Sequence, residues 1–291
     1  MGGCFEIMPL TPFQKRVLAL LTKNRSEESH LAGATGLGLS PESSRFSYDL
    51  DYFHDTEEAV AEAFALDRAA LEASDMDVEG LVTQPGFIRA LVSDSENELR
   101  VEWAHDSAWR FMPPVEMEGV GFVLHPVDLA VNKVLALAGR DEPRDLIDTL
   151  FVHEHILPLG ALVWAASGKD PGMNPAMLIE LLQRKGKLRE EDLRYLEIET
   201  VLDLAELRSA WRDALAEAKS FVNSRPSDEA GRLYVDPASG RFIAPEKDQE
   251  VELHEATRGG VLPFVEGLGC DRPDEMTSRF FALKGPGSQK I

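Results

Sequence analysis

The sequence is poor in cysteine, in positive charge and in long hydrophobic runs. Its two cysteines, Cys4 and Cys270, lie near opposite ends of the 291 residues, which excludes a disulfide framework and suits a reducing compartment. It has no run of about 18 apolar residues, so no membrane-spanning segment is expected. The first residues, MGGCFEIMPLTPFQKR, lack the basic start and long apolar centre of a signal peptide. The expected location is therefore the cytoplasm.

Positive charge is scarce in this chain. Thirty lysines and arginines stand against 51 aspartates and glutamates, which gives a formal net charge of −21. Because phosphate contacts supply most of the affinity of non-specific nucleic-acid binding, this balance argues against a generally basic binding surface. A nucleic-acid substrate would need a local basic patch. The densest positive run, RKGKLR, is either such a patch or an ordinary solvated loop, and its cations are Arg184, Lys185, Lys187 and Arg189.

The patterns of apolar residues predict an α+β protein. A hydrophobic content of 44% is enough for a packed core, and the length suits one large domain or two ordinary ones. In the first half, predicted helices alternate with predicted strands. The helices are expected at 12–23, 35–39, 56–73 and about 127–138, and the strands near residue 31, around residues 49–53, and in a β-meander over 78–104.

The pattern becomes helical beyond residue 155. Apolar or amphipathic stretches occur at 157–166 and 175–184, and residues 189–222 supply one or two longer helices. A polar linker at 224–230 precedes a hairpin signal, in which DPASG joins residues 232–235 to 241–244. The expected domains are therefore a catalytic domain over 1–155, a helical region over 156–223, and a hairpin and tail over 224–291.

Asp49 and Asp51 stand at alternate positions of a predicted strand. Their side chains share one face, with Cα atoms roughly 6–7 Å apart. Carboxylates that close repel each other unless a cation lies between them, and oxygen ligands of this kind suit Mg²⁺ together with substrate phosphates. The small-residue turn Gly33-Ala34-Thr35, which ends 14 residues before Asp49, could present backbone N–H groups to those phosphates. This combination indicates phosphoryl or nucleotidyl transfer.

Two segments in order resemble the AbiEii/AbiGii-type nucleotidyltransferases, toxins of bacterial toxin–antitoxin and abortive-infection systems. The first, HLAGATGLGL followed by RFSYDLDYF, is similar to the family's Leu-x-Gly-Gly-Thr-Ala-Leu turn and Arg-x-Ser-x-Asp-Leu-Asp-Leu-Phe strand. The second, DLAVNKVLALAGRDEPRDLIDTL, is similar to the family's lysine-containing helix and Arg-Asp-x-x-Asp motif. The chain departs from the pattern at Ala34, the family's second glycine, and at Gly36, where alanine is usual. The first match consists of Gly33, Thr35, Leu37, Arg45, Ser47, Asp49, Leu50, Asp51 and Phe53.

The resemblance covers about residues 15–155 and implies a fold and an activity. The implied fold is a nucleotidyltransferase-like mixed sheet with helices, which a helical C-terminal region and a terminal β-hairpin would follow. The implied activity is Mg²⁺-dependent transfer of a nucleoside monophosphate from an NTP such as ATP to an acceptor hydroxyl on tRNA or protein. A cognate antitoxin would be a further partner.

The resemblance also implies roles for single residues. The catalytic set would be Asp49, Asp51, Lys133, Asp145 and Asp148. The nucleotide-binding set would be Gly33, Ala34, Thr35, Arg45, Ser47 and Lys133, with Arg45 and Ser47 bracing the acidic strand. Lys133 would contact phosphate, and one of the two later aspartates would orient it or act as a base. The alternatives are a solvated lysine and a pair of acids at a helix start, where acids are favoured anyway.

Glu102 is the candidate third metal ligand, beside Asp49 and Asp51. It shares a strand face with Arg100, so it either completes the metal site or pairs with that arginine or with water. Two other functions stay open. The chain could be an inactive nucleotidyltransferase-fold protein that acts through interactions, or a nucleotidyltransferase that modifies a small molecule.

Overall fold

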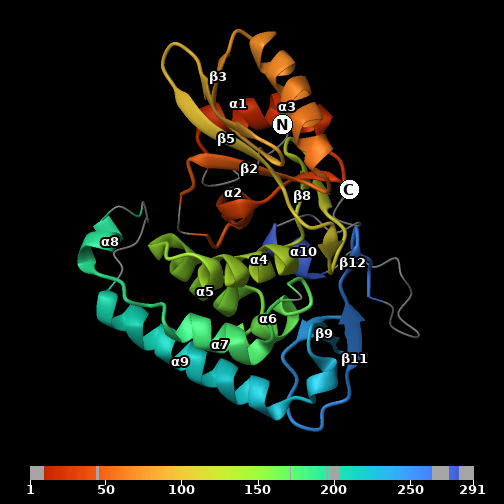
Figure 1. Cartoon of the computed structure of the whole chain (residues 1–291). Coiled ribbons are helices and arrows are strands. Elements are labelled where there is room, and N and C mark those ends of the chain that lie inside the picture. Colours follow the sequence, from red (N-terminus) through yellow and green to blue (C-terminus); the bar gives the residue numbers. More distant parts are fainter. Residues whose placement is uncertain are drawn as a thin grey trace, which may run out of the picture. The chain divides into compact units, whose positions relative to one another are not determined.

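The computed structural model of the chain contains two compact units, whose elements are labelled in Figure 1. The first contains Met1–Ala108 and Pro113–His125, and the second contains Trp109–Met112 and Pro126–Ile291. The last boundary between the units follows His125. The catalytic domain expected from the sequence ends later, at residue 155. The structure describes residues 10–43, 46–170, 172–194, 196, 203–263 and 275–281.

A mixed seven-stranded sheet forms the centre of the first unit. Its order is β3-β4-β5-β2-β1-β8-β7, and β2 pairs parallel to β5 and antiparallel to β1. The strands are β1 (Ser29–Leu31), β2 (Asp49–His54), β3 (Asp77–Gln84), β4 (Phe87–Ser93), β5 (Glu98–His105), β7 (Val115–Met117) and β8 (Gly121–Val123). The helices are α1 (Pro12–Leu21), α2 (Gly33–Gly38) and α3 (Glu57–Glu72), with a 3₁₀ turn, η1 (Thr22–Asn24), after α1.

The two faces of the central strands differ in polarity. Tyr52 of β2 and Trp103 of β5 are fully buried, and Phe64 of α3 packs edge-on against Trp103 with ring centroids 5.0 Å apart. Burial of these aromatic rings stabilises the packing of α3 on this face of the sheet. On the opposite face, Asp49 and Asp51 are only partly buried. The alternation in sequence therefore keeps charged groups away from the core.

Helices dominate the second unit. They are α4 (Pro126–Gly139), α5 (Pro143–His155), α6 (Leu159–Ala166), α7 (Pro175–Gln183), α8 (Glu190–Arg194), α9 (Leu204–Ser224) and α10 (Glu275–Phe280), with a 3₁₀ turn, η2 (Ser227–Glu229). Every residue of α6 is buried, and this helix contacts α4, α5, α7 and α9. The amphipathic helix α9 extends along the outside of this unit (Figure 1).

Short strands complete the second unit. β9 (Arg232–Val235) lies between β10 (Phe242–Ile243) and β11 (Glu252–Glu255), and β6 (Trp109–Arg110) pairs with β12 (Thr257–Arg258). The antiparallel pairing of β9 with β10 is the hairpin that the sequence predicts. The predicted fold class is confirmed, because the chain is an α+β protein with a mixed sheet and a mainly helical second half.

The segment Trp109–Met112 belongs to the second unit because Asp128 binds it. The Asp128 carboxylate accepts hydrogen bonds from the backbone N–H groups of Phe111 and Met112, at 3.0 and 2.9 Å. Lys169 Nζ lies 3.3 Å from Asp128 Oδ1 and neutralises it. Nε2 of buried His254 lies 2.7 Å from the Phe111 carbonyl oxygen. This network connects α4, the loop after α6 and β11 through a segment that precedes all of them in sequence.

No single helix within the described part of the chain is long and apolar enough to cross a membrane. Among the described residues, only α5 and α6 taken together reach that length and composition, and their axes bend by 111° at the break between them.

Candidate active site

The acidic side chains of β2 lie on the partly exposed face of the sheet. Asp49 and Asp51 are two residues apart on one strand, so they share that face. The parallel register places Arg100 of β5 beside Asp49, and Glu102 beside Asp51. The two strands therefore bring three carboxylates and a guanidinium together on one face.

Arginines neutralise two of these carboxylates. Arg100 donates a hydrogen bond to Asp49 Oδ2, and its Nε lies 3.7 Å from Glu102 Oε1. Arg89 of β4, which faces Glu102 in the antiparallel register, donates to Glu102 Oε1 at 2.8 Å. The hydrogen bond to Asp49 is the main cause that raises the pKa of Arg100 above its usual value. The arginines supply counter-charge to the crowded carboxylates.

Gly33 lies directly against the side chain of Asp51. Its φ is +62°, a left-handed conformation that favours glycine. A Cβ at this position would stand 2.6 Å from Asp51 Cγ, closer than any ordinary contact. Only a residue without a side chain therefore allows this turn to pass the carboxylate.

Backbone hydrogen bonds fix the same turn to β2. The N–H of Ala32 donates to the Asp51 carbonyl at 2.8 Å, and the Thr35 hydroxyl donates to the Asp49 carbonyl. Thr35 is 1% exposed, whereas Gly33 and Ala34 are only partly buried. The turn Gly33-Ala34-Thr35 is thus held beside both aspartates, with Gly33 and Ala34 partly exposed next to the carboxylates.

The other candidates of the first unit have separate positions. Ser47 is partly buried, and its carbonyl accepts a hydrogen bond from Gln14 Nε2 of α1 at 2.6 Å, which anchors the segment that leads into β2. Arg45 lies outside the described residues.

The structure places the second motif in the second unit. Lys133 of α4 is 7% exposed, and its Nζ lies 2.7 Å from Asp148 Oδ2 and 3.7 Å from Asp145 Oδ1. Arg140 makes a two-pronged contact with Asp145, at 2.5 and 2.9 Å. The Thr149 hydroxyl donates to the Asp145 carbonyl at 2.6 Å. Lys133, Asp145 and Asp148 therefore form one buried charge cluster across α4 and α5, with Asp148 as the nearer partner of the lysine.

The chemistry of the donors on β2 suits a hard divalent cation. Mg²⁺ usually takes one or two carboxylates and keeps its other positions for water and substrate phosphates, so Asp49 and Asp51 could hold it. Within the described ranges, no group of three or more His, Cys, Asp or Glu side chains is arranged to bind a metal by itself. A cation held by Asp49 and Asp51 would take its other ligands from water and phosphate oxygens.

Sequence reasoning assigned no role to Arg89. It reaches Glu102 because β4 pairs antiparallel with β5, and the side-chain alternation in the β-meander was the signal that could have found it. The ion pair of Arg100 with Asp49 had no such signal, because it depends on the parallel pairing of β2 with β5, which are far apart in sequence.

No protein-family model matches the sequence, and no curated protein matches it. Among solved structures, JHP933 from Helicobacter pylori is similar over 74% of this chain and 95% of its own, with 18% identity and a TM-score of 0.46. MenT4, a nucleotidyltransferase toxin from Mycobacterium tuberculosis H37Rv, is similar over 74% of this chain and 83% of its own, with 17% identity and a TM-score of 0.49.

Proposed function

We propose that the protein is a nucleotidyltransferase that moves a nucleoside monophosphate from an NTP to an acceptor hydroxyl. The observation that carries this proposal is the contact between Gly33 and Asp51, with Asp49 on the same face of β2. A glycine turn packed against an acidic strand brings backbone N–H groups close to carboxylates, and both suit a site for metal-bound phosphates. An acidic strand that only served solubility would not need this close packing.

Asp49 and Asp51 would hold Mg²⁺, with Glu102 on the neighbouring strand as the candidate third ligand. The bound cation would supply charge neutralisation at the triphosphate. For the cation to bind, Arg100 must break its hydrogen bond to Asp49, and Arg89 must break its hydrogen bond to Glu102. Both guanidiniums are partly exposed, at 41% and 36%, so they can turn toward the phosphates, where their positive charge favours the departing pyrophosphate.

The turn Gly33-Ala34-Thr35 would bind phosphate oxygens through its backbone, as Arg45 and Ser47 brace the strand. Lys133 would contact phosphate from the second unit, with Asp145 and Asp148 setting its position; one of them would also assist as a base toward the acceptor hydroxyl. Positioning and electrostatics do most of the chemistry in such transfers. The assignment of these residues to one site is supported by the resemblance of both motifs to one family.

The proposed biological role is that of a cytoplasmic toxin of a toxin–antitoxin or abortive-infection system, with tRNA or a protein as acceptor and an antitoxin as partner. The support is the pair of sequence motifs. The test is incubation of the protein with each labelled NTP, Mg²⁺ and a mixture of tRNA and cell proteins. Transfer of label to one acceptor class, and its loss in Asp51→Asn, is expected. No labelling with any NTP would contradict the proposal.

One observation favours a second candidate, an inactive protein that acts through interactions. The ion pairs of Arg100 with Asp49 and of Arg89 with Glu102 would stabilise the acidic face with no metal at all. Calorimetric titration of Mg²⁺ together with a non-hydrolysable NTP distinguishes the two functions. Heat of binding that disappears in Asp51→Asn favours the enzyme, and its absence from the wild type favours the interaction protein.

A further inference from the structure

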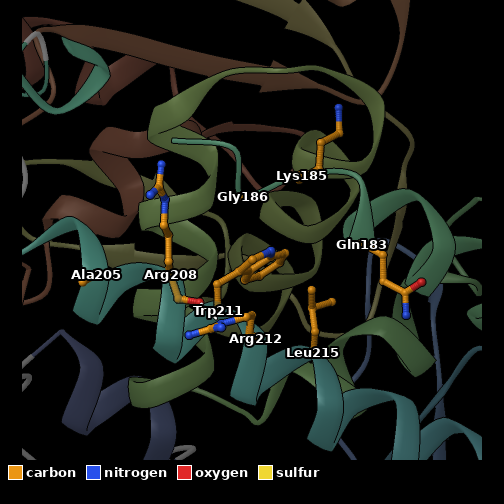
Figure 2. Close-up of a pocket in the computed structure, with 8 residues that line it drawn as sticks. All are labelled: Gln183, Lys185, Gly186, Ala205, Arg208, Trp211, Arg212 and Leu215. Atoms are coloured by element: carbon orange, nitrogen blue, oxygen red, sulfur yellow. Dashed lines mark hydrogen bonds between the residues drawn. The ribbon is translucent and has the colours of Figure 1, made fainter. Parts of the chain in front are cut away.

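A basic hollow of about 390 Å³ lies in the second unit, between the loop after α7 and one face of α9. Figure 2 shows its lining, with Lys185 and Gly186 on the loop and the α9 side chains facing them. Residues 208, 211, 212 and 215 recur at helical spacing, so they share one face of α9. The lining consists of Gln183, Lys185, Gly186, Ala205, Arg208, Trp211, Arg212 and Leu215.

The charge of this hollow is opposite to that of the chain. The whole chain has a net charge of −21, yet the lining contains three cations and no acid. Helix α9 also carries Glu206, Asp213 and Glu217, but none of them is among the lining residues. Local concentration of one charge on an oppositely charged protein attracts ligands of the other sign. The ligand that suits this hollow is therefore an anion.

The two arginines keep donors for such a ligand. Arg208 donates to the Leu188 carbonyl at 2.5 Å, and Arg212 Nε donates to the Arg208 carbonyl at 3.1 Å. Each of these hydrogen bonds uses only part of a guanidinium, which has five N–H donors in a planar fork that matches phosphate. Both side chains are on exposed residues. Lys185 is engaged differently, since its Nζ donates to the Arg140 carbonyl at 2.9 Å. The same Nζ lies 3.8 Å from Asp141 Oδ1, so the two arginines are the main recognition groups of the hollow.

Trp211 forms the buried floor of the hollow. The residue is 3% exposed, and within the described part of the chain no group accepts a hydrogen bond from its Nε1. Gly186, with φ +83°, passes directly over the indole, and a Cβ there would stand 2.7 Å from Nε1. A buried indole N–H without a partner is costly. Gly186 thus shapes the loop around the tryptophan.

We propose that this hollow binds phosphate groups of a nucleic-acid strand. The lining cations continue outside the hollow into Arg184, Lys187 and Arg189, all exposed on the same loop. An open basic track of this kind suits a polyanion, whereas a single phosphate ion would gain from an enclosed site. The choice of a nucleic acid over free phosphate rests on the proposed function, in which tRNA is one of the acceptors.

The test compares two double variants of the full chain with equal loss of charge. Arg208→Gln/Arg212→Gln removes the hollow's arginines, and Lys219→Gln/Lys247→Gln removes two exposed lysines of the same unit that do not line it. Binding of fluorescently labelled, unfractionated tRNA is measured by anisotropy at several salt concentrations, and thermal melting verifies that both variants fold.

The arginine variant should bind tRNA about tenfold more weakly, with the log–log salt slope shallower by about 1.5 units for two lost contacts. The lysine variant should stay within about twofold of wild type. Gly186→Ala should also weaken binding, although it changes no charge. Equal losses in both double variants, or no loss in the arginine variant, would overturn the proposal. A further outcome would also overturn it. If the arginine variant lost the change in tryptophan fluorescence that inorganic phosphate causes in the wild type, but still bound tRNA normally, the hollow would be a site for free phosphate.

Binding and transfer can fail separately. Asp51→Asn should bind tRNA as the wild type does, because the hollow does not include that residue. If the wild type labels tRNA but the arginine variant binds it normally, the hollow is not the contact and the proposed function stands. If the wild type binds tRNA through the hollow but transfers nothing, the proposed function is wrong and the binding site stands.

Discussion

Replacing Gly33 by alanine tests whether the turn positions the Asp51 carboxylate. The new Cβ would stand 2.6 Å from Asp51 Cγ, whereas ordinary van der Waals contact begins at 3.4 Å. The carboxylate or the turn must therefore move by roughly 1 Å, and a displacement of that size can lower a catalytic rate about 100-fold. The φ of +62° adds about 1–2 kcal/mol of backbone strain for alanine. We expect kcat for NTP-dependent labelling to fall about 100-fold, and the free energy of unfolding to fall by about 1–3 kcal/mol.

Gly119→Ala is the matched control. Gly119 belongs to the same unit and has φ +78°, but a Cβ there would meet nothing within 4 Å. It should therefore lose only the stability that backbone strain costs, about 1–2 kcal/mol in urea unfolding, and keep its labelling rate. If Gly33→Ala lost stability as Gly119→Ala does but kept wild-type kcat, Asp51 would not require its present position. The metal site on β2 would then be wrong.

Three further predictions concern buried or crowded charge. Asp51→Asn should abolish labelling and leave the melting temperature unchanged or higher, because it relieves carboxylate repulsion; a clear drop in calorimetric melting temperature would contradict this. Lys133→Gln should lower the free energy of unfolding by about 3 kcal/mol, because it removes the positive charge that lies 2.7 Å from the buried Asp148 carboxylate. Addition of Asp148→Asn should recover stability but not labelling, and urea titration would test the rescue. Burial and nearby Arg25 lower the pKa of His54 to about 3. The folded state therefore favours neutral His54, whereas the unfolded chain protonates it below about pH 6.5. The free energy of unfolding should fall by about 1.4 kcal/mol per pH unit as the pH falls from about 6.5 toward 3. His54→Leu should flatten that decline, and unchanged pH dependence would refute it.

Local features of the fold could be predicted from the sequence. The first helix was expected to begin at residue 12, and it does, with Thr11 as its N-cap accepting a hydrogen bond from the Gln14 N–H. The alternation around Asp49 and Asp51 predicted one polar strand face, which the burial pattern of β2 shows. These features depend on side-chain periodicity and capping within a few residues, which a single sequence records directly.

Long-range features could not be predicted in the same way. Apolar periodicity indicated that residues 99–104 form a strand, but it does not encode that this strand lies parallel to β2. The ion pair of Asp49 with Arg100 could therefore not be predicted without knowing the order of the strands in the sheet. Likewise, the basic run RKGKLR was visible in the sequence, but the two arginines of α9 that share its hollow are separated from it by a helix and a connection. Their spacing of four residues gave no sign that they face that loop.

The binding of Phe111 and Met112 by Asp128 has a consequence for how the polypeptide can be divided. The chain leaves the first unit at Ala108, joins the second, returns at Pro113 and leaves again after His125. A single proteolytic cut at any of these three crossings would therefore leave one fragment without a segment of its unit. A fragment that begins at Pro126 would lack β6 and would leave the Asp128 carboxylate without two backbone donors. During synthesis, residues 109–112 must wait for α4 and β11 to emerge before they find their partners, so the second unit matures only after nearly the whole chain is made.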